Sequence, residues 1–339
     1  MIDVATIAFI YNHPCPLKCN FCCHTQENVG PGRLSPENVR PMLLGFASEP
    51  SVVRFAFTGG DPFLYIDEIL SIMTVAREKG VTQPFHIVTS AFWAKSDDIT
   101  TKYIRSLADL GMDLLYVSYD HEHARWVDKS QIERVVRICR SHGVKVFIYG
   151  IFWDQYDRVE DLLPNLDAPM SSDVALSIGA GREIYGNAPR YDIPEEAKFR
   201  CIKPRHYDVA IYPNGDAFPC CSGGFNKEGE LNCGNVFQET PRSVLDKVFS
   251  HFHARIAKEI GFNDLYDQVG KMKPELMPML PKLDEVDSVC EICSRIHGNA
   301  ELRQELTSVY EAMEMEYATS RLDLVMTKVQ STSSLPILP

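Results

Sequence analysis

The sequence predicts an α/β fold built on a parallel sheet. Two observations support this prediction. Short apolar segments rich in β-branched residues alternate with amphipathic helical segments from the N-terminus to about residue 180, an order typical of βα units with parallel strands. The chain also has 339 residues, of which 45% are hydrophobic, so it is long enough to bury a full core and to carry a smaller second unit.

Each predicted strand is a short apolar run that ends in turn residues, and each predicted helix has apolar residues at helical spacing. Strands are expected at residues 4–10, 52–58, 85–89, 114–118, 144–149 and 174–178. Helices are expected near residues 36–46, 66–79, 98–110, 129–142 and 157–165. The carboxyl ends of these strands should therefore meet at one edge of the sheet, where sites gather in barrel folds.

Three cysteines follow the first predicted strand at a characteristic spacing. Cys15, Cys19 and Cys22 form a Cys-x3-Cys-x2-Cys pattern, with Phe21 directly before the third cysteine. Three thiolates leave one iron of a four-iron cluster without a protein ligand, which favours chemistry at the cluster over electron transfer alone. A zinc site or scattered structural thiols are the alternatives.

A second motif lies at the end of the second predicted strand. Gly59, Gly60, Asp61 and Pro62 form a tight turn before the next helix. Glycines let a backbone approach a ligand closely, and a carboxylate accepts hydrogen bonds from an ammonium group. Taken alone, this sequence is more often an ordinary turn.

Together the two motifs resemble those of the radical S-adenosylmethionine (radical SAM) enzymes. The resemblance implies a partial (β/α)6 TIM-like barrel and a [4Fe-4S] cluster on Cys15, Cys19 and Cys22 whose free iron binds SAM. Reductive cleavage of SAM would then give a 5′-deoxyadenosyl radical. Phe21 and the motif at 59–62 would contact the cofactor, although the family motif has Glu where this chain has the shorter Asp61.

Three further residues at strand ends are candidate SAM contacts. Ser90 and Ser118 end the third and fourth predicted strands, and Arg182 follows the sixth. The alternatives are helix caps for the serines and a surface ion pair for the arginine. Asp120, His121 and His123 form a polar cluster, which is interpreted as a solvated loop without a catalytic histidine; the alternative is that it faces the substrate.

A second group of cysteines follows residue 186, where prolines become frequent. Cys201 and Cys220 flank a predicted β-hairpin that turns at residues 214–215, and Cys290 and Cys293 form a Cys-x2-Cys pair. The arrangement resembles the SPASM and twitch modules, and the absence of cysteines after Cys293 favours the single-cluster twitch form. This resemblance implies one auxiliary [4Fe-4S] cluster, and a zinc knuckle is the alternative.

Cys221 is a candidate catalytic residue because a thiol beside the barrel mouth could give a hydrogen atom to a substrate radical, as in related epimerases. The alternatives are that it replaces Cys220 or Cys233 as a ligand, or that it is a small buried hydrophobe. Cys139, on a predicted amphipathic helix, is expected in the core.

These patterns predict a small C-terminal cysteine-rich auxiliary-cluster domain and a C-terminal helix. The predicted units are a barrel at 1–186, the auxiliary module at 187–298, a helix at 299–329 and a flexible tail at 330–339. The net charge of −12 argues against nucleic acid or an anionic membrane as partners. Without an export signal or a membrane span, the eleven cysteines point to metal ligands in a reducing cytoplasm.

The sequence thus predicts a radical SAM enzyme that abstracts hydrogen from a peptide or small natural product. Oxidative modification or cross-linking is favoured, as in peptide maturases. A redox-neutral epimerase that uses Cys221 and a non-catalytic iron–sulfur or zinc scaffold are the alternatives. The resemblance implies a flavodoxin- or ferredoxin-type electron donor. A peptide would be held by the barrel mouth, by the 222–289 insertion or by a separate leader-peptide-binding protein.

Overall fold

A computed structural model describes residues 3–23, 32–175, 180–181, 199–201, 206–220, 231–286 and 288–333 of the chain. Its centre is one open sheet with the strand order β6-β5-β4-β3-β2-β1-β7-β8. Strands β1 to β7 pair in parallel, and β8 is antiparallel to β7. The predicted parallel α/β fold is confirmed.

The first five strands agree with the predicted positions to within a few residues. They are β1 (Val4–Asn12), β2 (Val52–Gly59), β3 (Phe85–Thr89), β4 (Met112–Ser118) and β5 (Lys145–Phe152). The sixth strand, β6 (Met170–Val174), lies earlier in the chain than the expected 174–178, so its predicted position is wrong. Residues 176–179 lie outside the described part. Among the described strands, β6 pairs only with β5, at the edge of the sheet. Its residues are mostly polar and half-exposed, so no apolar run marks this strand in the sequence.

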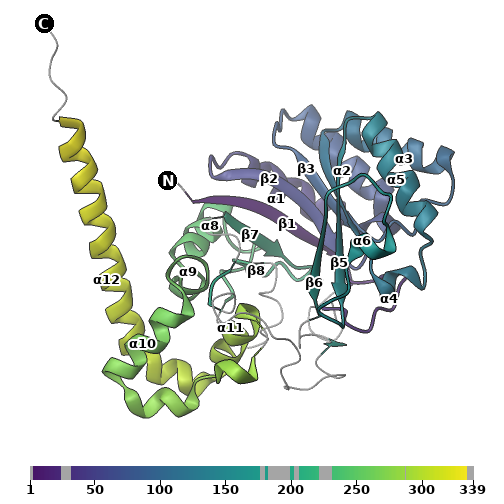
Figure 1. Cartoon of the computed structure of the whole chain (residues 1–339). Coiled ribbons are helices and arrows are strands. Elements are labelled where there is room, and N and C mark those ends of the chain that lie inside the picture. The colour runs from purple at the N-terminus through teal and green to yellow at the C-terminus, as the bar shows by residue number, and fades with distance from the viewer. Residues whose placement is uncertain are drawn as a thin grey trace, which may run out of the picture.

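The helices between these strands pack on the outer face of the sheet (Figure 1). The main ones are α1 (Pro36–Ala47), α2 (Ile66–Glu78), α3 (Asp97–Asp109) and α5 (Lys129–Ser141), joined by the short η2 (Pro62–Tyr65), α4 (His121–Ala124) and α6 (Val159–Leu162). Side chains of Ser35, Ser96 and Asp128 cap three of these helices, as expected for short polar residues at an N-cap. The helix expected at 157–165 is present as α6, which is only one turn long.

The predicted hairpin extends the same sheet. Strand β7 (His206–Ile211) pairs with β1, and β8 (Ala217–Phe218) returns beside β7. Gly215 has a φ of +88°, which an L side chain rarely adopts, so the turn residue is placed as predicted. The second cysteine region is thus joined to the barrel sheet through β1.

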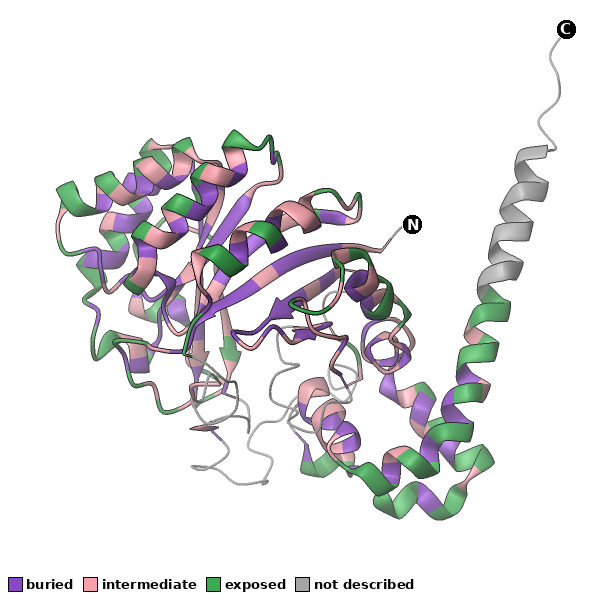
Figure 2. Cartoon of the chain, turned by 180° about the vertical axis from the view of Figure 1, so that it is seen from behind, coloured by how far each residue is buried: buried purple, intermediate pink, exposed green. Residues whose placement is uncertain are grey.

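The described residues from 241 to 333 are mostly helical, and the helices from α9 onward lie beyond the β7–β8 edge (Figure 1). This region comprises α8 (Pro241–Ser250), α9 (Phe252–Arg255), the π-helical η5 (Ile256–Ile260), α10 (Phe262–Met272), η6 (Pro274–Met279), η7 (Leu283–Glu285), α11 (Val289–His297) and α12 (Ala300–Ser333). Helix α12 projects from the body (Figure 2). It confirms the predicted C-terminal helix, but it continues to Ser333, so the expectation of a tail from residue 330 is wrong for residues 330–333; residues 334–339 lie outside the described part.

Within the part of the chain that the structure describes, two large apolar cores and one small apolar cluster around Ile10 and Phe218 hold these parts together. The sheet and its covering helices share one core, in which Phe9, Phe55, Phe57 and Phe85 are fully buried and their rings stack across neighbouring strands. Helices α9 to α12 share a second core. Cys139 is buried in the first core, as predicted. Among the described residues, no helix is long and apolar enough to cross a membrane.

Candidate active site

The cysteine loop begins where β1 ends and opens onto a cavity at the carboxyl ends of the parallel strands. Cys15, Cys19 and Cys22 line this cavity, whose volume is about 310 Å³. The cavity is also lined by five of the predicted cofactor contacts: Phe21, Gly59, Gly60, Ser90 and Ser118. Residues from β2, β3, β4 and the cysteine loop are thus brought together as expected from parallel strands.

The two glycines place the segment that leads into Cys15. Gly59 has a φ of +132°, and a Cβ there would lie 2.2 Å from the carbonyl oxygen of Asn12. A Cβ on Gly60 would lie 2.1 Å from the carbonyl oxygen of Pro14. The Gly60 amide also donates to the Asn12 carbonyl at 2.5 Å. Close approach was predicted for a ligand; the structure shows close approach to the protein's own cysteine loop.

Asp61 is fully buried and its carboxylate is surrounded by donors. It accepts hydrogen bonds from the Ser90 amide at 2.8 Å, the Ser90 hydroxyl at 2.7 Å and the Thr89 hydroxyl at 3.0 Å. It also caps η2 by accepting from the Phe63 amide, 3.1 Å away. Pro62 is the buried first residue of η2. Asp61 therefore holds Ser90, and a contact of Asp61 or Pro62 with SAM stays a prediction.

Burial controls the protonation of these groups. It raises the pKa of Asp61, while hydrogen bonds from Ser90, Phe63 and Thr89 oppose that change. Burial raises the pKa of Cys15 to about 11, and the nearby carboxylate of Asp61 and thiol of Cys22 add to the increase. The pKa of Cys19 is also raised, first by burial and then by Asp120 and Cys22. Because iron binds thiolates, cluster binding must displace protons from these thiols.

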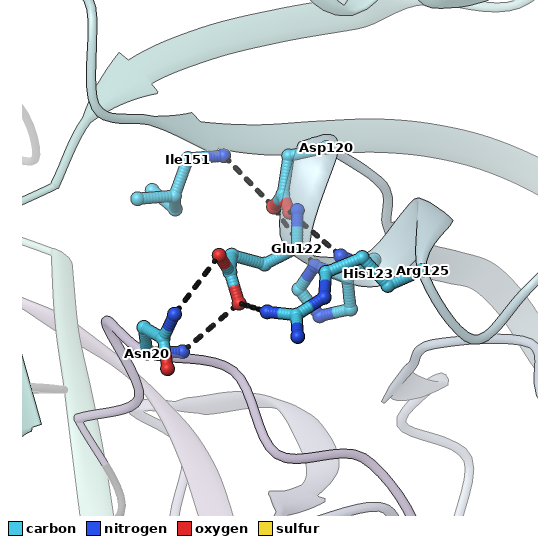
Figure 3. Close-up of polar contacts among 6 residues, drawn as sticks. All are labelled: Asn20, Asp120, Glu122, His123, Arg125 and Ile151. Carbon is cyan, nitrogen blue, oxygen red and sulfur yellow. Dashed lines mark hydrogen bonds and ion pairs between the residues drawn. The ribbon is translucent and has the colours of Figure 1, made fainter.

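The interpretation of residues 120–123 as a solvated loop is wrong for all but His121. Asp120 is fully buried and accepts from the amides of Glu122, His123 and Ile151 at 3.0, 3.0 and 3.1 Å (Figure 3). It also bonds the His123 Nδ1 atom at 2.8 Å, and both Asp120 and His123 line the cavity. An Asp at the N-cap of a helix was the available sequence signal.

Of the second cysteine group, Cys201, Cys290 and Cys293 lie close enough to interact. Burial raises the pKa of Cys293, and the thiols of Cys290 and Cys201 raise it further. Cys220 follows β8 and is half-buried. Cys233 is instead buried in the main core, and burial raises its pKa to about 12. Arg182 and Cys221 lie outside the described residues, so their predicted roles stay predictions.

The first cysteine group fits a [4Fe-4S] cluster that binds SAM. Its three cysteines line one cavity, together with Gly59, Gly60, Ser90 and Ser118. Each iron of such a cluster takes one thiolate, so three thiols leave one iron open. In the described ranges, no three His, Cys, Asp or Glu side chains converge on the position of a single metal ion.

Comparison with known proteins supports the resemblance seen in the cysteine and glycine motifs. Residues 10–163 match the Radical SAM superfamily. The chain is 22% identical over 325 residues to the Bacillus subtilis (strain 168) protein named "Putative peptide biosynthesis protein YydG"; the match covers 92% of this chain and 97% of that protein.

Solved structures give the same fold. Native anSMEcpe with bound AdoMet and Cp18Cys peptide is 15% identical, with a TM-score of 0.55, and the match covers 96% of this chain and 99% of that chain. BtrN in complex with AdoMet and 2-DOIA is 17% identical, with a TM-score of 0.50, and the match covers 76% of this chain and 89% of that chain. These likenesses concern the fold alone, and they confirm the predicted partial barrel.

Proposed function

Because this chain is an enzyme of the radical SAM superfamily, which implies a [4Fe-4S] cluster and SAM, we propose that it removes a hydrogen atom from a C–H bond of a peptide and oxidises or cross-links that peptide. The observation that supports this most is the cavity shared by Cys15, Cys19 and Cys22 with the polar ends of β2, β3 and β4. The similarity to a protein named for peptide biosynthesis supports a peptide over another small natural product.

When bound, the cluster and SAM supply a radical able to abstract hydrogen from an unactivated C–H bond. The chain's own residues supply the site. The thiols of the loop bind iron, the Gly59–Gly60 turn fixes where that loop begins, and Asp61 holds Ser90, which lines the cavity. Tyr149, His123 and Asp173 line the same cavity and give it polar side chains that a peptide backbone can contact.

A second cluster would accept the electron that oxidation releases. Cys293 lies close to both Cys290 and Cys201, and it packs against a small apolar cluster that includes Ile10 of β1 and Phe218 of β8. Since β1 leads directly to Cys15, this group lies along the strand that carries the first cysteine loop. Such a cluster would supply the one-electron acceptor, so that the peptide would lose a hydrogen atom to the adenosyl group, an electron to the cluster and a proton to water.

The first experiment tests radical initiation. The protein is reconstituted anaerobically with iron and sulfide, reduced with dithionite and given SAM, and 5′-deoxyadenosine is measured. The intact protein should form it, and a Cys15→Ala/Cys19→Ala/Cys22→Ala variant should not. If neither protein forms 5′-deoxyadenosine, or if zinc fills the thiol sites, the proposal is wrong and a metal scaffold takes its place.

The second experiment tests the reaction type with a library of synthetic peptides that carry deuterated side chains. Oxidation should transfer deuterium to 5′-deoxyadenosine and leave a peptide that lacks two hydrogen atoms. Products that keep their hydrogen count and carry a solvent-derived hydrogen would instead establish the epimerase alternative, and a Cys221→Ala variant should then stop that exchange.

The third experiment tests the auxiliary cluster. A Cys290→Ala/Cys293→Ala variant should bind about half the iron of the intact protein, because each cluster holds the same number of irons. It should still cleave SAM, because the first cysteine group is intact. Unchanged iron content would remove the auxiliary cluster from the proposal.

A further inference from the structure

The cysteine loop is held from the far side of the cavity by one carboxylate. Glu122, on the short helix α4, accepts hydrogen bonds from the backbone amide and the side-chain amide of Asn20, each at 3.2 Å (Figure 3). Asn20 lies between Cys19 and Cys22. The bond to the backbone amide acts on the loop itself, whichever side chain stands at position 20.

Glu122 is a fixed side chain rather than a surface carboxylate. Its exposed fraction is 8%, and its remaining partner is the Arg125 guanidinium at 3.1 Å. Asp120 fixes the start of α4 by accepting from the amides of Glu122 and His123, and it ties that start to the Ile151 amide of β5. The carboxylate that reaches the loop is therefore anchored to two strands of the barrel.

Aromatic contacts also hold the cysteine loop. The ring of Phe21 packs on His123 with centroids 6.0 Å apart and edge-on to Trp153 at 5.6 Å. Asn20 and Phe21 together thus attach the stretch between the second and third cysteines to α4 and the residues that follow β5. The Gly59–Gly60 turn holds the other end of the loop, before Cys15.

We propose that Glu122 is a positioning residue for the iron–sulfur cluster: it holds the Cys19–Cys22 segment in place and its negative charge lowers the cluster's reduction potential. The inference rests on the proposed function, because it assumes that a cluster occupies this loop. The electrostatic part follows from Coulomb's law, since reduction adds a negative charge to a cluster that lies close to a buried carboxylate.

Two substitutions of Glu122 distinguish the effect of its hydrogen bonds to the loop from the effect of its negative charge. Glu122→Gln removes the charge and keeps one of the two oxygen acceptors, which can still take the backbone amide of Asn20, whereas Glu122→Ala removes both acceptors. Glu239→Gln is the matched control, because Glu239 also accepts from a backbone amide, a side-chain donor and a cation, namely Asn235, Ser243 and Lys247. It lies before α8, away from the cysteine loop.

The first measurement is hydrogen exchange of the backbone amides at residues 19–23 in protein without iron. Exchange should be faster in Glu122→Ala by tenfold or more, should change less in Glu122→Gln, which keeps one of the two acceptors, and should equal that of the intact protein in Glu239→Gln. Iron content after reconstitution should fall in Glu122→Ala only. Equal exchange and equal iron in all four proteins would overturn the positioning role.

The second measurement is the reduction potential of the cluster whose EPR signal changes on addition of SAM. In Glu122→Gln the reduction potential of the cluster should become more positive. At a fixed electrode potential, the ratio of reduced to oxidised cluster should therefore rise about tenfold. An Arg125→Gln variant, which leaves Glu122 without its cation, should shift it in the opposite direction. Potentials equal to that of Glu239→Gln would overturn the electrostatic role.

These outcomes are independent of the enzyme's reaction. The exchange measurement uses protein without a cluster, so it decides the contact between Glu122 and Asn20 even if no 5′-deoxyadenosine is ever formed. If Glu122→Ala does not fold, Glu122→Gln and Arg125→Gln still test the effect on potential.

Discussion

The two cysteine groups of this molecule are held in place by different kinds of contact. The first sits on a loop fixed by directional polar contacts: the Gly60 amide bonds the Asn12 carbonyl, and the Glu122 carboxylate bonds Asn20. In the second, Cys290 and Cys293 lie on helix α11, whose Ile292 and Ile296 are buried in the C-terminal core. That group is brought together chiefly by apolar packing between helices.

The difference bears on how each site responds to change. A hydrogen-bonded loop keeps its shape only if specific donors and acceptors remain, and one added atom at a close approach disrupts it. Apolar packing is less directional and tolerates substitutions that conserve volume. We therefore expect the first site to be sensitive to small local substitutions, and the second to be sensitive to the stability of the helices around it.

The largest effect is expected for Gly60→Ala. Its Cβ would lie 2.1 Å from the Pro14 carbonyl oxygen and 2.4 Å from that of His13, so the segment before Cys15 must move. The free energy of unfolding should fall by about 3 kcal/mol, and reconstituted iron should drop to the level of the auxiliary cluster alone. Urea unfolding and iron analysis measure these effects.

Gly32→Ala is the matched control, because a Cβ there meets no atom within 4 Å. Gly32 also lies beside the same segment, where its carbonyl accepts from the His13 amide at 2.9 Å. If the two variants behave alike, close packing at Gly60 does not hold the loop.

A smaller effect is expected for Asp61→Asn. The carboxylate of Asp61 accepts from Ser90 and Thr89, and an asparagine amide would present a donor to at least one of these donors. The expected loss is about 1–3 kcal/mol of stability, with weaker SAM binding because Ser90 is no longer held at the cavity wall. Isothermal titration calorimetry with SAM measures the second effect.

The control for Asp61→Asn is Asp97→Asn, which removes an exposed carboxylate bound to Arg134 and Arg137. Such surface ion pairs contribute at most about 1 kcal/mol, and SAM binding should not change. Equal losses of stability and of SAM binding in the two variants would show that the buried Asp61 carboxylate matters no more than an exposed one.

The same contrast explains how far the sequence alone could predict the molecule. The cysteine spacing and the Gly-Gly-Asp-Pro turn are local patterns, and the structure brings them to one cavity as expected. The contact between Asn20 and Glu122 joins residues 102 positions apart. It depends on where the one-turn helix α4 points after β4, which no local pattern specifies.

In the fold, the inner strands were predictable because buried strands are apolar runs, whereas the edge strand β6 was misplaced because its residues are largely half-exposed. The helices at 241–285 were not predicted, although signals were present. Thr240 caps α8 and Pro241 is its first residue, a combination typical of a helix start. The frequent prolines of this region mark starts of helices as well as breaks.

The smallest expected effect concerns acid stability of the C-terminal core. The His253 ring lies between the rings of His297, 4.7 Å away, and Tyr310, 4.4 Å away. His297 is almost fully buried, and its two ring nitrogens have no hydrogen-bond partner among the described residues. Burial lowers the pKa of His253 to about 4 and that of His297 well below its ordinary value.

Both imidazoles are therefore neutral in the folded protein, whereas the unfolded chain takes up protons once the pH falls below about 6.5. Their contribution to stability is complete above that pH and is lost progressively toward about pH 4 for His253. One pKa unit corresponds to about 1.4 kcal/mol, so a loss of about 1–3 kcal/mol is expected between pH 7 and pH 5.5. Urea unfolding at the two pH values measures it.

A His253→Gln/His297→Gln variant should be less stable at pH 7 but should lose less on acidification than the intact protein. His121→Gln is the control, because the His121 side chain is 55% exposed and bound to Asp157. His86 in the barrel, whose pKa burial lowers to about 4, contributes an acid slope of the same sign in all three proteins. An acid slope in the double variant as steep as that of the control would place the acid sensitivity in the barrel and not in the C-terminal core.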